Sequence, residues 1–180
     1  MGNTKTRKFV IVTITLFLIV TTLLIAKDQG KLAPFWTIDI NRQEVDESIF
    51  TPYRLTLVNI WATFCPPCLQ EMPALGELRR EFADQGFNIV GIVTDVFDRN
   101  ERKFQANLNL ANLIVERTKA DYRHLLISED LHNLRLKDSQ VVPESFFVDR
   151  QGNIVGGTYY GAKSKAAWKK TIESTLKLVN

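Results

Sequence analysis

Cys65 and Cys68 are the only cysteines in the 180-residue sequence, and two residues separate them. This C-x-x-C spacing is typical of a redox pair or of half a metal site. A structural zinc site needs four Cys or His ligands, and the only two histidines, His124 and His132, lie far downstream and eight residues apart. The sequence therefore favours a dithiol that opens and closes, and it predicts neither a metal nor another cofactor.

The cysteine pair lies where a strand-like run changes to a helical pattern. Residues 57–61 are almost continuously apolar, as in a central strand that is buried on both faces. From residue 66 to about residue 84, apolar side chains recur every three or four positions, which predicts a helix that begins at Pro66. The free amides and the dipole at a helix N-terminus favour negative charge. The pKa of the Cys65 thiol is therefore expected to fall below the free value of about 8.5.

This placement predicts different roles for the two sulfurs. Cys65 is expected to attack a substrate disulfide, and Cys68, one helical turn deeper, to resolve the mixed disulfide that forms. Pro66 and Pro67 fit the first turn of a helix, where the amide hydrogens are unpaired in any case. Their fixed φ angles also stiffen the loop that joins the two sulfurs.

Glu71 follows Cys68 by three residues and so lies on the same side of the predicted helix. Two interpretations stay open. Glu71 is either a solvated surface glutamate, or a partly buried carboxylate with a raised pKa that takes or gives the Cys68 proton.

The pair Val142-Pro143 also has two interpretations. Pro143 either simply begins a strand, or forms a cis peptide opposite the sulfurs that exposes the Val142 backbone to a substrate chain. Trp61 and Phe64 are expected in the core, with Phe64 also placed to shield the Cys65 thiolate.

The N-terminus carries the features of a membrane anchor. Residues 9–26 contain no charge, follow three basic residues, and form a helix long enough for a hydrocarbon layer of about 30 Å. We therefore predict an uncleaved anchor over residues 1–27; the alternative is a signal peptide, cleaved to give a secreted protein, but residues 24–27 lack a small-x-small exit. The positive-inside rule keeps the N-terminus in the cytoplasm and exports the catalytic domain, where protein disulfides are available as substrates.

The rest of the chain is expected to form a tether, residues 28–34, and one α/β domain, residues 35–180. Residues 35–40 and 44–45 predict a hairpin. The other expected strands are 57–61, 87–93, 123–127, 144–149 and 154–158, and the expected helices are 66–84, 98–119, 130–136 and one that is capped by Ser164. This order predicts a central mixed sheet, parallel in its first half and antiparallel in its second, with helices on both faces.

The charge distribution argues against nucleic-acid binding. Lys5, Arg7 and Lys8 account for the whole formal net charge of +3, so the remainder of the chain is neutral. A neutral domain has no basic excess to meet phosphates.

The chain resembles the thioredoxin superfamily, and within it the membrane-anchored TlpA/ResA-like thiol–disulfide oxidoreductases of bacteria. The resemblance runs from about residue 33 to the C-terminus and rests on W-A-T-F-C-P-P-C, on Glu71 and on V-P-E-S-F-F-V-D-R-Q-G-N-I-V-G. It implies a thioredoxin fold in which Cys65 is the nucleophile, Cys68 its partner, Pro143 the cis-proline and Glu71 an active-site glutamate. It also implies reduction of protein disulfides outside the cytoplasm, often in cytochrome c maturation, with electrons from a CcdA-type membrane partner.

Two rival functions stay open. A peroxiredoxin would carry threonine three residues before its reactive cysteine, and Ala62 occupies that position. A non-catalytic binding module would use the cysteine pair as a static staple, although so small a loop removes little chain entropy. The Pro-Pro dipeptide, where thioredoxin has Gly-Pro, leaves the direction of electron flow open. Residues 107–136 exceed what a minimal thioredoxin needs and receive no role.

Overall fold

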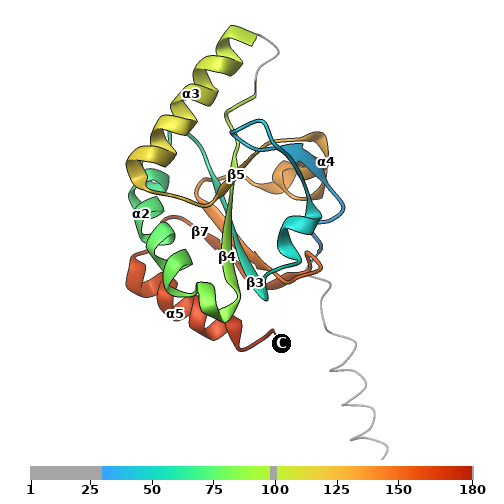
Figure 1. Ribbon diagram of the computed structural model, residues 1–180, viewed down its shortest axis with the longest axis vertical. Helices are drawn as coiled ribbons and strands as arrows, with labels where there is room; N and C mark the ends of the chain where they lie inside the picture. The colour runs from blue at the N-terminus through green and yellow to red at the C-terminus, as the bar shows by residue number, and fades with distance from the viewer. Residues whose placement is uncertain (1–29, 98–100, 180) are drawn as a thin grey trace, which may run out of the picture.

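The computed structural model describes residues 30–97 and 101–179. Within these residues, a five-stranded sheet in the order β5-β4-β3-β6-β7 forms the centre of the domain (Figure 1). The strands are β3 Leu55–Trp61, β4 Phe87–Val93, β5 Arg123–Leu126, β6 Glu144–Val148 and β7 Ile154–Tyr160. β3, β4 and β5 run parallel, whereas β6 is antiparallel to both β3 and β7. The predicted change from parallel to antiparallel pairing is therefore confirmed.

Helices and a small hairpin cover the two faces of this sheet. One face packs against α2 Pro66–Glu81, α3 Glu101–Thr118 and α5 Lys165–Leu176. The other packs against the hairpin of β1 Trp36–Ile38 and β2 Glu44–Asp46, the 3-10 turns η1 Glu47–Phe50 and η3 Leu136–Asp138, and α4 Glu129–Leu134 (Figure 1). The predicted hairpin and the two-sided covering are both confirmed.

The central strand β3 directs alternate side chains to these two faces. Leu57 and Trp61 belong to the core under α2, whereas Val58 and Ile60 belong to the core under the hairpin. Asn59 therefore lies on the α2 face, in the middle of a strand whose residues are all buried. A polar side chain in that position needs a hydrogen-bond partner.

Helices α2 and α5 begin where the sequence places them. Cys65 is the N-cap residue of α2, and α2 gives way to the 3-10 turn η2 Ala83–Gln85 before Gly86, whose φ of 75° ends the segment. Ser164 caps α5 by accepting a hydrogen bond from the N–H of Ala167 at 3.3 Å. Both cysteines are thus held at the first turn of a helix that packs on the sheet.

The N-terminal boundary of the domain needs a correction. Residues 30–34, predicted as part of a tether, pack on the domain: Leu32 is 1% exposed, and its N–H donates to the carbonyl of Gly152 at 2.8 Å. The N–H of Ile154 donates to the carbonyl of Gly30 at 3.1 Å. The predicted anchor, residues 1–27, lies outside the described residues, and over 30–97 and 101–179 no helix has the length and apolarity to cross a bilayer.

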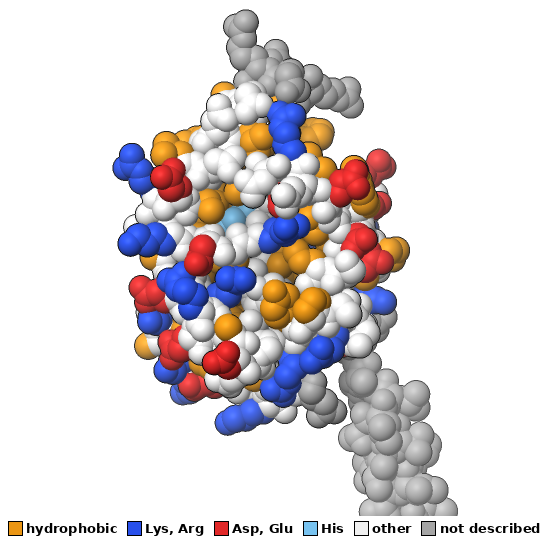
Figure 2. All heavy atoms as spheres, in the orientation of Figure 1, with side chains coloured by type: hydrophobic (Ala, Val, Ile, Leu, Met, Phe, Trp, Pro, Cys, Tyr) orange, Lys and Arg blue, Asp and Glu red, His pale blue; other side chains and the backbone are white. Residues whose placement is uncertain are grey.

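The surface carries charges of both signs. Figure 2 shows basic and acidic side chains interspersed over the visible face of the described chain, with apolar side chains between them. Some of these charged side chains form ion pairs. Lys165 Nζ lies 2.7 Å from Glu77 Oε2, and Arg80 Nη1 lies 2.7 Å from Asp121 Oδ1.

Candidate active site

Cys65 and Cys68 are joined by a disulfide, with their Cα atoms 5.3 Å apart. The sulfur of Cys65, the N-cap residue, accepts the N–H of Cys68 at 3.3 Å. Cys65 keeps 4% of its surface exposed and Cys68 keeps 0%. Of the two cysteines, only Cys65 therefore reaches the surface, and α2 has no acidic residue in its first turn to oppose a thiolate there.

The loop that delivers Cys65 is fixed by Asp95, which follows β4. The carboxylate of Asp95 accepts the N–H of Thr63 at 3.0 Å and also the Thr63 hydroxyl. From α3, the side-chain amide of Asn107 donates to the Asp95 carbonyl at 2.9 Å. Hydrogen bonds thus connect the loop before Cys65, the residue Asp95 after β4, and α3. The residue spacing predicted neither Asp95 nor Asn107 in this arrangement.

Trp61 and Phe64 differ in their surroundings. Trp61 is 0% exposed, as predicted, and its indole N–H donates to His124 Nδ1 at 3.1 Å. The other ring nitrogen of His124 lies 3.0 Å from the Ala120 carbonyl, and burial lowers the pKa of His124 to about 4, so the ring is neutral near pH 7. Phe64 is 73% exposed, so its predicted core position is wrong, and it stands in solvent beside Cys65.

Glu71 is 3% exposed, so the surface interpretation is wrong and the predicted burial is confirmed; the proton exchange with Cys68 stays a prediction. Three donors converge on its carboxylate. Asn59 Nδ2 donates to Oε1 at 3.0 Å, while Trp168 Nε1 and the backbone N–H of Lys163 donate to Oε2 at 3.0 and 3.1 Å. The carboxylate is therefore held by β3, α5 and the loop between β7 and α5.

Burial raises the pKa of the Glu71 carboxyl above its ordinary value. The hydrogen bonds from Trp168, Lys163 and Asn59 oppose this effect, as does the positive charge of Lys163. The Lys163 ammonium lies 4.9 Å from the ring centroid of Tyr159 and 5.6 Å from that of Trp168. The site thus contains a carboxyl that holds its proton to a higher pH than a free glutamate, three residues from Cys68 on the same helix.

Sequence reasoning missed the three donors to Glu71. Asn59 left one signal, an amide in an otherwise apolar strand, because a buried polar group has to find a partner. Trp168 is one of the buried residues of α5, and an apolar position on a helix gives no sign of where its indole N–H donates. Lys163 donates its hydrogen bond through its backbone N–H, which any residue except proline could supply, so its side-chain type did not indicate this bond.

The predicted cis-proline is present: the Val142–Pro143 peptide is cis. Val142 packs against the core cluster that contains both cysteines, and Pro143 is buried. Val142 and Phe64 line one cavity of about 410 Å³, whose other lining residues are Thr94, Ile127, His132, Leu136, Ser139, Gln140 and Val141. Val142 therefore lies near the cysteine motif, through both the core cluster and the cavity. Pro66 and Pro67 are exposed at the start of α2.

The structure also places residues 107–136, the segment that a minimal thioredoxin does not need. It supplies the second half of α3, the edge strand β5 and helix α4. Three of its residues, Ile127, His132 and Leu136, line the cavity that Phe64 and Val142 also line. The insertion therefore borders the candidate site.

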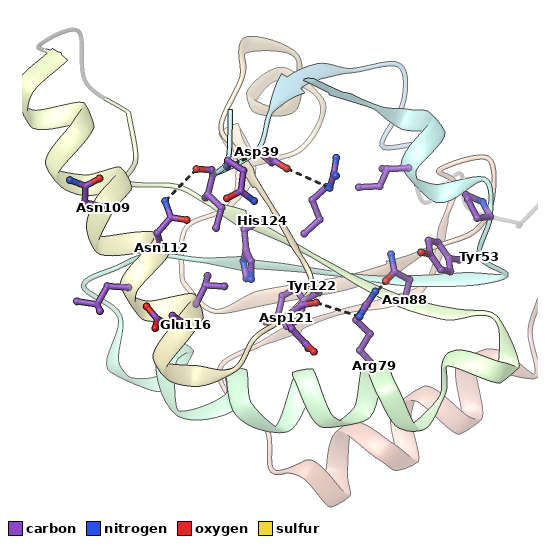
Figure 3. Close-up of a pocket in the computed structure, with 17 residues that line it drawn as sticks. Asp39, Tyr53, Arg79, Asn88, Asn109, Asn112, Glu116, Asp121, Tyr122 and His124 are labelled. Carbon is purple, nitrogen blue, oxygen red and sulfur yellow. Dashed lines mark hydrogen bonds and ion pairs between the residues drawn. The ribbon is translucent and has the colours of Figure 1, made fainter. Parts of the chain in front are cut away.

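A larger cavity of about 1110 Å³ lies elsewhere, between α3, the start of β5 and residues 39–53 (Figure 3). Polar residues line much of it, among them Asp39, Asn88, Asn109, Asn112 and Glu116. The residues that line it do not include Cys65, Cys68 or Glu71. This cavity is thus distinct from the candidate active site.

Comparison with known proteins places this site in a family. Residues 28–173 match the Redoxin family model. The thiol:disulfide interchange protein DsbE of Pasteurella multocida (strain Pm70) is 28% identical over 146 residues, covering 80% of this chain and 72% of that protein. The thiol–disulfide oxidoreductase ResA of Bacillus thuringiensis subsp. konkukian (strain 97-27) is 26% identical over 129 residues, covering 70% and 66%. The thioredoxin-like protein YneN of Bacillus subtilis (strain 168) is 31% identical over 78 residues, and the match spans only 45% of its length.

Solved structures support the fold independently. A thiol:disulfide interchange protein of the thioredoxin family from Chlorobium tepidum TLS superposes with a TM-score of 0.66 at 22% identity, over 84% of this chain and 99% of that one. The predicted thioredoxin-like fold is therefore confirmed. With a matching family model over most of its length, this chain belongs to the Redoxin family and resembles relatives named as thiol–disulfide oxidoreductases of the ResA and DsbE type.

Proposed function

We propose that this protein is a thiol–disulfide oxidoreductase that reduces disulfides of protein substrates through Cys65 and Cys68. The observation that carries the proposal is the Cys65–Cys68 disulfide at the N-terminus of α2, with exposed surface on the first residue alone. The names of its ResA and DsbE relatives agree with this activity.

The reaction starts from the reduced dithiol. The Cys65 thiolate attacks one sulfur of the substrate disulfide, forms a mixed disulfide and releases the other substrate sulfur as a thiolate. Cys68 then loses its proton and attacks the Cys65 sulfur, which releases the second substrate thiolate. The substrate gains two electrons and two protons, and the enzyme is left with the Cys65–Cys68 disulfide seen in the structure.

In this scheme Glu71 receives the Cys68 proton. It lies one helical turn beyond Cys68 and is buried with it, so no bulk water is at hand to do so. Because burial raises its pKa, Glu71 can also return the proton to a departing thiolate.

Substrate binding is assigned to the segment around Pro143 and to the exposed start of α2. Within the described chain the backbone of Val142 makes no hydrogen bond, so it is available to pair with an extended substrate. The exposed Phe64 and the cavity it shares with Val142 offer apolar contacts next to Cys65. Pro66 and Pro67 shape the approach to the sulfurs.

Two further parts of the proposal rest on the sequence and the resemblance alone. Residues 1–27 anchor the protein in the membrane, with the N-terminus in the cytoplasm, and a membrane protein of the CcdA type supplies electrons. Sedimentation of the full chain with membranes after alkaline washing tests the anchor; recovery in the soluble fraction would favour cleavage and secretion.

A redox titration tests the proposed activity. We expect mild dithiol reductants to open the Cys65–Cys68 bond reversibly, and the reduced protein to reduce a protein disulfide such as those of insulin. A bond that resists these reductants would indicate a structural staple. Consumption of peroxide, in place of disulfide reduction, would indicate a peroxiredoxin.

Glu71→Gln should change how the exchange rate depends on pH. In the native protein the rate should fall as the pH drops through the raised pKa of Glu71, because a protonated Glu71 cannot accept the Cys68 proton. In the variant this acid limb should disappear, with a loss of about 10²-fold at neutral pH, at the low end for general acid–base groups. Stopped-flow kinetics would measure the profile and circular dichroism the fold. An unaltered profile would remove Glu71 from the mechanism.

A further inference from the structure

The carboxylate of Glu71 is held by parts of the chain that are far apart in sequence. Asn59 lies 12 residues away, the Lys163 N–H 92 residues away and Trp168 97 residues away. All three donors lie within 3.1 Å of a carboxylate oxygen. A buried carboxylate with donors on both oxygens has one fixed orientation.

We propose that Trp168 and Asn59 are positioning residues that hold the Glu71 carboxylate beside the redox pair and set the pH at which it takes up a proton. This inference rests on the proposed function, because it concerns the same carboxylate. It adds the C-terminal helix α5 to the parts of the chain that control the reaction.

Trp168 is fixed in place by its neighbours. Its side chain is 0% exposed, and its ring meets those of Tyr159 and Phe147 edge-on, with centroid distances of 5.6 and 6.4 Å. The indole has a single N–H donor and no acceptor. The N–H therefore points at Glu71 Oε2 and cannot turn to another acceptor unless the aromatic cluster repacks.

Asn59 is oriented by its two amide hydrogens. Its Nδ2 donates to Glu71 Oε1 and to Ser145 Oγ, both at 3.0 Å. Its carbonyl oxygen is buried and has no hydrogen-bond partner in the described chain. Leaving a buried acceptor unpaired is unfavourable, so this arrangement indicates that donation to Glu71 and Ser145 determines how the amide lies.

Several charged or titratable groups face the same carboxylate. Lys163 contributes a positive charge that favours ionised Glu71. Tyr122 is buried, and burial followed by the Glu71 charge raises its pKa, so it stays neutral. When the pair is reduced, the Cys68 thiol lies one turn away on α2. Burial favours the protonated carboxyl and the donors favour the ionised form, so removal of a donor shifts the balance toward the protonated form.

Trp168→Phe tests the proposal because it keeps an aromatic ring and removes the N–H donor. We expect the midpoint for protonation of Glu71 to rise by about one pH unit, the size expected for a hydrogen bond to a charged group. The ¹³C chemical shift of the Glu71 carboxyl, followed by NMR in the oxidised protein, measures this midpoint. Trp36→Phe is the matched control, because Trp36 is 55% exposed and takes no part in the site; its midpoint should equal that of the native protein.

A midpoint in Trp168→Phe that equals the native value would overturn the proposal. If that variant does not fold, Asn59→Ala removes the donor to the other oxygen and should raise the midpoint in the same direction; an unmoved midpoint there would equally overturn it. The NMR measurement needs no turnover, so it separates this inference from the proposed function. A shifted midpoint with unchanged exchange kinetics would support the positioning role and contradict the catalytic role of Glu71.

Discussion

Cys68→Ser is expected to convert the protein into a trap for its own substrates. Cys65, the only one of the two cysteines with exposed surface, can still attack a disulfide, but no second sulfur remains to release the mixed disulfide. Turnover should fall to the uncatalysed background. Non-reducing electrophoresis of cells that express this variant should show covalent adducts that a reductant dissolves, and mass spectrometry of the adducts would identify the substrates.

Cys65→Ser is the matched control for this experiment. It retains the buried Cys68, which is 0% exposed, and should therefore lose turnover without forming adducts. Adducts that form on Cys65→Ser and not on Cys68→Ser would reverse the assigned roles of the two sulfurs. Adducts on neither variant, with a folded protein in both, would contradict exchange with protein disulfides.

The second large effect is expected on stability, from Arg135→Met. The side chain of Glu144, which directly follows Pro143, is 0% exposed and is paired with Arg135 Nη2. Arg135 Nη2 also donates to Thr158 Oγ1 at 3.2 Å, and its guanidinium lies 5.1 Å from the ring centroid of Phe146. Breaking a buried ion pair by removing one partner costs about 3–5 kcal/mol, because the remaining charge is left unpaired. Urea denaturation should therefore show a free energy of unfolding lower by about 3 kcal/mol.

Two further variants separate burial from charge pairing. The double variant Arg135→Met with Glu144→Gln should recover much of the loss, because no unpaired charge remains. Lys165→Met, which breaks a surface pair with Glu77 at side-chain exposures of 45% and 53%, should change the free energy of unfolding by less than about 1 kcal/mol. If Arg135→Met changed the free energy of unfolding as little as Lys165→Met, the buried ion pair would contribute no more to stability than the surface pair.

Much of the fold was predictable because it follows local patterns. The continuous apolar run at 57–61 reflects burial on both faces of a strand, and it appears as part of β3. The segment 35–40 also contains a strand, β1, but its burial does not follow the apolar pattern, because Trp36 is 55% exposed whereas Thr37 is buried. The N-cap position of Cys65 followed from the change of pattern at Pro66, since a proline is favoured in the first turn of a helix. The cis-proline at Pro143 came from the resemblance.

The surroundings of the candidate site were less predictable. A spacing of three residues predicted that Glu71 lies on the same side of α2 as Cys68. It could not predict the hydrogen bonds from Lys163 and Trp168, which are more than 90 residues away in the sequence. Phe64 was predicted in the core because aromatic side chains usually lie there, yet it is exposed beside Cys65. These features depend on long-range contacts, which residue types and spacing do not encode.

The contribution of α5 has a consequence for biosynthesis. Both cysteines leave the ribosome well before Lys163 and Trp168, the two donors to Glu71 Oε2. A nascent chain, or one shortened by a late stop codon or a protease, therefore holds a complete C-x-x-C motif while its carboxylate still lacks those two partners. Under the role proposed here for Glu71, a chain that ends before Trp168 should therefore show a different pH dependence of disulfide exchange from the full chain.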